Sequence, residues 1–280
     1  MNRKKISIIG AGNMGACIIS GLIKSGYPEK NLWVSNPSKI KLNKLHEKYN
    51  ELINVTTSNT EAVNNSDIIL LTVKPITIPS VLKEISILLK DRKKLIISVA
   101  AGVSEKSIEH FIKFPTPIIK AMPNIPSIIG CGATGLYANS NVSDDDKNLC
   151  ETIFRTFGVI VWVDQENLID AITAVSGCGP AYFFLVMEAI QNAGEKLGLP
   201  KETAKLLTMQ TALGAAKMAI ESSENVNELR QVVTSKGGAT EMAINTLESL
   251  NIRDIFNTAL TSANLRAKEL EEIIKKEMES

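Results

Sequence analysis

A glycine-rich turn near the start of the chain does most to limit the folds open to this sequence. Gly10, Gly12 and Gly15 directly follow a strand-like run at residues 5–9 and directly precede a helix-like run at residues 16–24. This order is typical of the first βαβ unit of a dinucleotide-binding domain, where the helix N-terminus offers N–H donors to the phosphates. We therefore predict a cofactor site that includes Gly10, Gly12, Asn13, Met14 and Gly15.

Apolar, β-branched runs alternate with helical segments up to about residue 163. Continuous apolar strands separated by helices predict a parallel sheet that is covered on both faces. After Asp164 the strand signals end and a series of helices follows, one of them begun by Pro180 and another, at residues 201–220, rich in alanine. We predict an α/β class: a Rossmann-type dinucleotide-binding domain at residues 1–164, then an all-α domain at 165–280. The expected strands are residues 5–9, 32–35, 67–73, 95–99, 118–122, 133–138 and 159–163.

Charge and cysteine content exclude several other classes. The formal net charge of +1 makes nucleic acid a poor partner. Two histidines and four scattered cysteines predict no metal site, and free thiols in a reducing compartment. No uninterrupted apolar run approaches the roughly 20 residues of a membrane span, so we expect a cytoplasmic protein without a membrane partner. The cysteines are Cys17, Cys131, Cys150 and Cys178, and we expect Cys178 to be a buried structural thiol.

The segment after the second expected strand bears on the choice of nicotinamide cofactor. NAD-selective sites place an acidic residue there, to bind the ribose hydroxyls. This chain has hydroxyls, an amide and a lysine instead, and these favour a 2′-phosphate. We predict NADPH, with NADH as the alternative. Two other readings stay open: Ser38 only caps the following helix, or Lys39 only faces solvent. The residues concerned are Ser35, Asn36, Ser38 and Lys39.

Two further loops follow strands at the edge of the sheet where such folds bind ligands. In an open α/β sheet the ligand crevice lies outside the carboxyl ends of the strands. Both loops should therefore border the cofactor, and the second is too small in its side chains to hold a nicotinamide ribose away. Lys74 could be a catalytic acid, but a positioning role or a solvated charge is the preferred interpretation. The loops contribute Val73, Lys74 and Pro75, and Ala100, Ala101 and Gly102.

A second glycine loop opens a helix in the C-terminal half. Gly237 and Gly238 precede Ala239 and Thr240, so exposed backbone N–H groups form a seat for a carboxylate beside the Thr240 hydroxyl. From the residues alone, Thr240 serves either this site or only the cap of the helix.

Taken together, these segments resemble pyrroline-5-carboxylate reductases along essentially the whole chain. Two departures stand out: Lys236 replaces the usual proline of the glycine loop, and Asn225 and Val226 replace a His-Pro pair. Neither change removes a donor that the chemistry needs. The resemblance is carried by residues 9–15, 73–75, 122–124, 170–182, 213–218 and 233–240.

The resemblance implies an activity and a set of roles. The reaction would be hydride transfer from NAD(P)H to the C=N bond of 1-pyrroline-5-carboxylate, giving L-proline in the last step of its biosynthesis. It implies that Gly237, Gly238, Ala239 and Thr240 bind the substrate carboxylate, with the Thr240 hydroxyl toward the ring nitrogen, and that Glu166 lies at the edge of the proline site. It also implies dimerisation through the C-terminal helices. Around the cofactor it places Ser35, Asn36, Asn59, Val73, Lys74, Ala100 and Ala101.

Two other functions compete with this reading. A β-hydroxyacid dehydrogenase shares the two-domain plan but should carry a lysine in the helix after Ser176 and Gly177, where this chain has none before Lys196. A cofactor-binding protein without catalysis would be expected to lose the loop at residues 237–240, which is intact. Imine reduction needs neither a nucleophile nor a strong base, so we name no obligatory side-chain acid.

Overall fold

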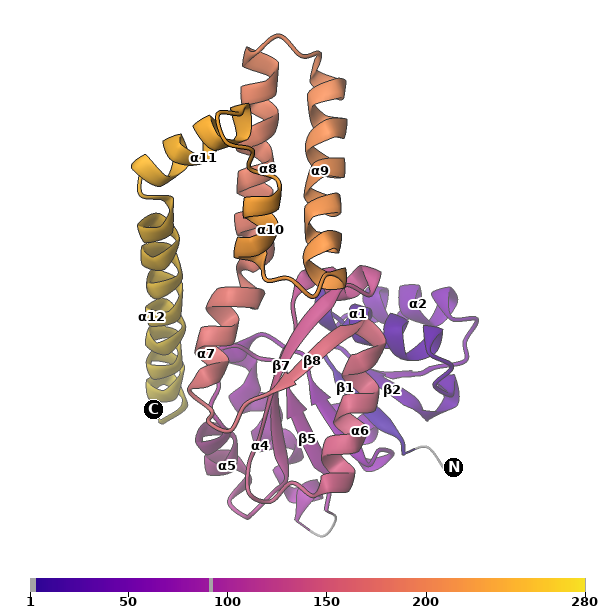
Figure 1. Cartoon of the computed structure of the whole chain (residues 1–280). Helices are drawn as coiled ribbons and strands as arrows, with labels where there is room; N and C mark the ends of the chain where they lie inside the picture. Colours follow the sequence, from indigo (N-terminus) through magenta and orange to yellow (C-terminus); the bar gives the residue numbers. More distant parts are fainter. Residues whose placement is uncertain (1–3, 91–92, 280) are drawn as a thin grey trace. The chain divides into compact units, whose positions relative to one another are not determined.

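A computed structural model describes residues 4–90 and 93–279 (Figure 1). The chain forms two compact units. One extends to Cys178 and takes in the chain again from Ala263, and the other is Gly179–Ser262. This division falls later than the boundary at residue 164 that the sequence suggests, because the segment after the sheet packs back onto it: Ile169 is 5% exposed and Ala174 is 2% exposed.

The first unit is built on an eight-stranded sheet of order β3-β2-β1-β4-β5-β6-β7-β8. The first six strands are parallel and show the doubly wound order of a Rossmann fold, while β7 runs antiparallel to β6 and parallel to β8. The predicted fold class is confirmed, and all seven expected strands are present. The strands are β1 Ile6–Ile9, β2 Leu32–Ser35, β3 Asn54–Thr56, β4 Ile68–Leu71, β5 Leu95–Ser98, β6 Ile118–Met122, β7 Gly132–Ala138 and β8 Gly158–Trp162.

Helices cover both faces of this sheet, and each face has its own core. Successive side chains of a strand point to opposite faces, so Ile8 packs in one apolar cluster and Ile9 in the other. Strands buried on both faces explain the continuous apolar runs in the sequence. The helices are α1 Asn13–Lys24, α2 Lys39–Lys48, α3 Asn59–Asn64, α4 Ile78–Leu89, α5 Glu105–Ile112, α6 Asp144–Phe154 and α7 Leu168–Ile172.

The helix that leaves the sheet continues through a wide turn. Thr173–Gly177 forms a π-helix in which the Cys178 N–H donates to the Thr173 carbonyl at 2.8 Å, and α8 (Gly179–Lys196) follows without a break. Gly177, Gly179 and Pro180 would ordinarily interrupt a helix here. Pro180 has no N–H for the Ser176 carbonyl, but the Asn124 side chain donates to that carbonyl at 3.0 Å. The freed acceptor is satisfied, and the helix is not broken.

This continuous helix also bears on the membrane prediction. By length and composition alone, Leu168–Lys196 could cross a membrane, since an 18-residue window within it has a mean hydropathy of 1.4, although the sequence had suggested no such segment. The core helix of a soluble protein can have the same length and composition.

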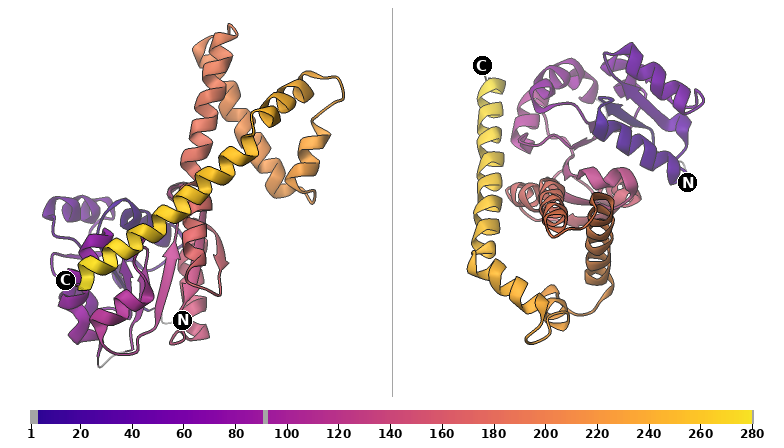
Figure 2. Two further views of the ribbon diagram at one scale, coloured as in Figure 1. Left: turned by 90° about the vertical axis from the view of Figure 1, so that its left-hand side faces the viewer. Right: turned by 90° about the horizontal axis from the view of Figure 1, so that it is seen from above.

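The second unit consists of helices only. The helices expected at residues 201–220 and after Gly238 are both present. α8 and α9 lie side by side in each view (Figures 1 and 2). Small residues of α9 line an apolar groove of about 740 Å³ together with Phe183 and Ile190 of α8. The helices after α8 are α9 Lys201–Glu221, α10 Val226–Val232, α11 Ala239–Ser249 and α12 Ile252–Glu279, the last of which ends in the first unit.

Candidate active site

The glycine turn between β1 and α1 has the geometry of a phosphate-binding loop. Gly10 adopts φ +109°, and its N–H donates to the Ser35 carbonyl at 2.8 Å. A Cβ on Gly15 would lie 2.2 Å from the Gly10 carbonyl oxygen, so only glycine lets the helix approach the strand this closely. A Cβ on Gly12 would meet no atom of residues 4–90 or 93–279 within 4 Å. The turn is therefore closed at Gly10 and Gly15 but open at Gly12, where a pyrophosphate would lie.

The start of α1 leaves hydrogen-bond donors for that space. α1 begins at Asn13, three residues earlier than predicted, so Asn13, Met14 and Gly15 form its first turn. Gly12 is the N-cap, and within the described residues no side chain caps this end of the helix. The first-turn N–H groups and the positive end of the helix dipole thus remain available to an anion.

Ser35 and Asn36, at the end of β2, support the glycine turn. Ser35 is 1% exposed and donates its hydroxyl to Asn59 Oδ1 at 2.5 Å, and the Asn59 amide donates to Glu84 Oε2 at 2.7 Å. Asn36 Oδ1 accepts the Ala11 N–H at 3.2 Å. The Asn36 side chain and the Ser35 carbonyl therefore both support the glycine turn directly, whereas the Ser35 hydroxyl is engaged with Asn59.

Ser38 and Lys39 lie at the start of α2. The Ser38 hydroxyl accepts the Lys41 N–H at 3.4 Å, which is the capping role that the sequence left open, and Lys39 is exposed. Residues 35–39, which begin at the last residue of β2, carry no acidic side chain.

The loops after β4 and β5 leave the sheet beside the glycine turn. The strand register pairs Ile9 with both Ser35 and Leu71, and Leu71 with Ser98, so all four strands end at one edge. Thr72 donates its hydroxyl to the Gly10 carbonyl at 2.6 Å and so joins the β4 loop to the turn. This edge gathers the predicted residues Val73, Lys74, Pro75, Ala100, Ala101 and Gly102.

Gly102 differs from the other residues in these loops. It adopts φ +69°, and a Cβ there would lie 3.1 Å from Ile274 Cδ1 in the last helix. Ala101 and Lys74 are exposed, while Ala100 is 7% exposed. The structure thus gives Gly102 a packing role against α12, whereas Lys74 and Ala101 remain accessible.

The second predicted site, residues 237–240, forms the start of α11 in the second unit. Gly237 has φ +74°, Gly238 is the N-cap, and Thr240 is the exposed second residue of the helix. Among the described residues no side chain caps α11, so Thr240 does not act as its cap. The sequence reasoning missed Glu241, whose Oε2 accepts the Gly237 N–H at 2.7 Å. An acidic residue directly after the predicted seat was the available signal.

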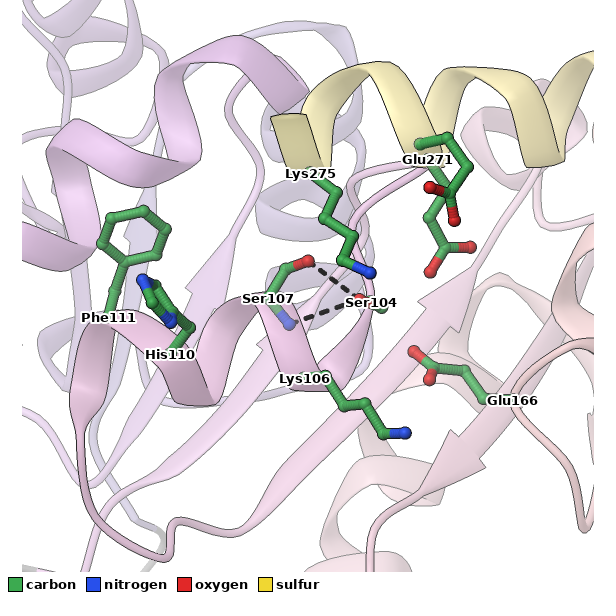
Figure 3. Close-up of a pocket in the computed structure, with 9 residues that line it drawn as sticks. Ser104, Lys106, Ser107, His110, Phe111, Glu166, Glu271 and Lys275 are labelled. Carbon is green, nitrogen blue, oxygen red and sulfur yellow. Dashed lines mark hydrogen bonds between the residues drawn. The ribbon is translucent and has the colours of Figure 1, made fainter. Parts of the chain in front are cut away.

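Glu166 lies in the first unit, in a polar cluster. Its Oε1 is 2.9 Å from the Lys120 Nζ and also accepts the Glu105 N–H at 2.7 Å. Figure 3 shows Glu166 and Glu271 reaching one pocket, of about 410 Å³, from the loop before α7 and from α12. Sequence reasoning did not single out Lys120, although a lysine within the apolar strand at residues 118–122 was a usable signal.

Burial shifts the proton affinities in this cluster. It raises the pKa of the Asp170 carboxyl, which the charge of Lys120 partly offsets, and it raises the pKa of Glu271 in the same way. Burial and the neighbouring Glu166 charge raise the pKa of Glu105, and burial raises the pKa of Tyr137 to about 12. Several carboxylates therefore share one buried cation.

Neither metal ligands nor reactive thiols stand out. Within residues 4–90 and 93–279, no group of three or more His, Cys, Asp or Glu side chains could hold a metal ion. Cys17 and Cys150 are buried, and burial raises the pKa of both thiols. Cys178, which the sequence predicted as a buried thiol, is half-buried.

Comparisons with known proteins find two family models that match different parts of the chain. Residues 166–270 match the model of pyrroline-5-carboxylate reductase dimerisation domains, and residues 5–102 match that of coenzyme F420-dependent NADP oxidoreductases. The chain is 43% identical to a pyrroline-5-carboxylate reductase of Pseudomonas aeruginosa over 97% of its length and 98% of the relative's. It is 38% identical to the Vibrio alginolyticus reductase, with 98% and 100% covered.

Solved structures give the same result. A Coxiella burnetii pyrroline-5-carboxylate reductase superposes with a TM-score of 0.92 at 49% identity, covering 96% of this chain and 99% of that one. A Plasmodium falciparum pyrroline carboxylate reductase with NADP bound superposes with a TM-score of 0.85 at 32% identity, covering 97% and 99%.

Proposed function

The chain belongs to the pyrroline-5-carboxylate reductase family, and we propose that it reduces 1-pyrroline-5-carboxylate to L-proline with NAD(P)H. The observation that carries this proposal is the 43% identity to a named reductase over 97% of the chain. The matched region extends beyond the glycine turn, which many oxidoreductases share, and includes the loop at residues 237–240. The β-hydroxyacid dehydrogenase alternative is not favoured.

The roles follow from the chemistry of an imine. When bound, NADPH supplies the hydride that adds to the C=N carbon. The first turn of α1 and the open space at Gly12 fit its pyrophosphate. The protein's contribution is to orient the two reactants and to place a hydrogen bond at the ring nitrogen. We assign cofactor binding to residues 1–164 and substrate binding, with self-association, to residues 165–280.

We propose Thr240 as the catalytic residue. Its hydroxyl lies in the first turn of α11 and is not used to cap it, so it is free to serve a ligand. Electron density builds on the ring nitrogen as hydride arrives, and a hydroxyl beside it stabilises the transition state more than the ground state. Gly237, Gly238 and Ala239 would hold the carboxylate, with Glu166 at the edge of the site.

We propose NADPH as the preferred cofactor, with NADH as the alternative. Residues 35–39 carry no carboxylate to repel a 2′-phosphate, and the exposed Lys39 adds positive charge at this edge. The full proposed cofactor site is Gly10, Gly12, Asn13, Met14, Gly15, Ser35, Asn36, Ser38, Lys39, Asn59, Val73, Lys74, Pro75, Ala100, Ala101 and Gly102.

The chain self-associates, and we propose that the C-terminal helices form the interface. In the single chain, Phe183 (67% exposed), Phe184 (63%) and Leu207 (52%) leave a wide apolar surface on α8 and α9. Monomeric proteins rarely expose such surfaces. This use also accounts for the apolar composition of the helix at Leu168–Lys196. Four free cysteines fit the cytoplasm as its location.

The decisive experiment follows NADPH absorbance with purified protein and 1-pyrroline-5-carboxylate, with proline identified as product. Substrate-dependent oxidation is expected, and Phe183→Glu should shift the mass in solution toward monomer. NADPH binding without turnover would favour the non-catalytic reading. Turnover of β-hydroxyacids with NADP⁺, and none of the imine, would favour the dehydrogenase.

A further inference from the structure

A buried lysine joins three segments of the first unit. Lys120 lies in β6 and is 5% exposed. Its ammonium is 2.9 Å from Glu166 Oε1, and the same oxygen accepts the Glu105 N–H at 2.7 Å. One carboxylate oxygen thereby ties the central sheet to the start of α5 and to the loop before α7.

Two more carboxylates lie within the field of this ammonium. Asp170 on α7 is 7% exposed, and Glu271 comes from α12. For both, the Lys120 charge is the largest influence that favours the ionised form, while the Glu166 charge opposes it. Lys268 also acts on Asp170, but its side chain is exposed. Lys120 is the buried cation around which these like charges remain close together.

The carboxylates of this cluster come from the two segments of the chain that flank the second unit. The chain leaves the first unit after Cys178 and returns to it at Ala263. Glu166 and Asp170 lie shortly before the exit, and Glu271 lies shortly after the return. Packing of the returning helix also involves Ile274, which is 8% exposed and contacts the loop at Gly102. The segments before the exit and after the return therefore each bring a carboxylate to this region, and Figure 3 shows Glu166 and Glu271 at the same pocket.

We propose that Lys120 is a positioning residue for the reductase reaction, which holds the loop before α7 and the returning helix α12 within the first unit. The inference rests on the proposed function, because Glu166, which we assign to the edge of the substrate site, is the carboxylate that Lys120 holds at 2.9 Å. Without Lys120, the carboxylates of Glu166, Asp170 and Glu271 repel one another, and the returning helix loosens. Lys120 is 5% exposed and acts through Glu166, so we assign it a positioning role rather than a catalytic one.

The test compares Lys120→Met, Lys120→Arg and the double variant Lys120→Met with Glu271→Gln, which restores the net charge of the cluster. Lys106→Met is the matched control, because Lys106 lines the same pocket but is exposed. For each protein we would measure kcat, the Kd of NADPH by fluorescence, and hydrogen exchange in peptides covering residues 166–172 and 263–276.

Lys120→Met should lower kcat roughly 10–100-fold, the scale of a small misplacement of reacting groups, with the Kd of NADPH within twofold. Exchange should rise in both peptides, and Lys120→Arg and the double variant should recover most of kcat. Unchanged kcat with a lower melting temperature would overturn the proposal, since Lys120 would then serve stability only.

A failure of the double variant to recover kcat while exchange is restored would also overturn it. If Lys120→Met does not fold, kcat and hydrogen exchange are compared between Lys120→Arg and the double variant, and these two variants decide between the same outcomes. Absence of imine reduction by the wild-type protein would instead refute the proposed function. The hydrogen exchange of residues 166–172 and 263–276 would still show whether Lys120 holds these two segments.

Discussion

Glu241 occupies one of the donors that the proposed substrate needs. Its Oε2 accepts the Gly237 N–H at 2.7 Å, in the loop that we assign to the carboxylate of 1-pyrroline-5-carboxylate. The substrate must displace this internal carboxylate or bind beside it. Replacing Glu241 by Ala should therefore strengthen substrate binding, and Glu241→Gln, which keeps a weaker acceptor, should have a smaller effect in the same direction.

The size of the effect follows from the exposure of the contact. Gly237 is exposed, Glu241 is half-buried, and their hydrogen bond is open to solvent, so its net value lies at the low end of the usual range, about 0.5–1.4 kcal/mol. Since about 1.4 kcal/mol corresponds to a factor of ten, KM for the imine should fall roughly two- to tenfold. Loss of an acidic residue from the first turn of α11 should also lower the melting temperature slightly, because it no longer complements the helix dipole.

The assay is a set of initial rates with varied imine at saturating NADPH. We expect KM for the imine to fall while kcat and the KM of NADPH stay within twofold. Glu202→Ala is the matched control, because Glu202 is an exposed acidic residue in the first turn of another helix, α9. A KM for the imine that is unchanged or raised in Glu241→Ala would refute the assignment of the Gly237 N–H to the substrate carboxylate.

Substitutions at four further positions test the rest of the proposed site. Thr240→Ala should lower kcat about 10–10³-fold without lowering the melting temperature, and Thr240→Ser should recover much of the loss; a lower melting temperature at constant kcat would contradict the catalytic role. Gly15→Ala should destabilise the fold by about 1–3 kcal/mol, because its Cβ would lie 2.2 Å from the Gly10 carbonyl oxygen. Gly12→Ala should keep the melting temperature and raise the Kd of NADPH at least about tenfold, because its Cβ points into the space proposed for the pyrophosphate; equal NADPH affinity would place the phosphates elsewhere. Asn36→Asp keeps the acceptor for the glycine turn and adds a charge, so kcat/KM should shift toward NADH, and an unshifted ratio would mean that this residue does not face the ribose.

Local patterns explain why so much of the first unit could be predicted. Each strand that the sequence predicted is a run of four or more mainly apolar residues, and the glycine turn is defined by φ and close approach, which Gly10 and Gly15 reveal in the sequence itself. The strand β3 was missed because Asn54–Thr56 is only three residues long, half-buried, and at the edge of the sheet. Its pairing with β2, and not its composition, makes it a strand.

The helix through Pro180 shows a different limit. Glycines and a proline in sequence indicate a break, because a lost N–H leaves a carbonyl without its partner. Here the partner comes from Asn124, 52 residues earlier in the chain, whose own Oδ1 accepts the Ala133 N–H at 2.9 Å. A continuous helix therefore depends on a contact that no local rule contains.

The same reasoning applies to the charges of the first unit and to its glycines. Lys120 within an apolar strand signals a buried ion pair, since burying an unpaired ammonium is costly, but its partners lie 46 and more residues later in the chain. Gly102 was predicted to lie beside the cofactor. Its φ of +69° favours glycine without any ligand, and a Cβ there would lie 3.1 Å from Ile274 Cδ1. The sequence thus indicates that glycine is needed at this position, whereas only the fold shows that the returning end of the same chain packs there.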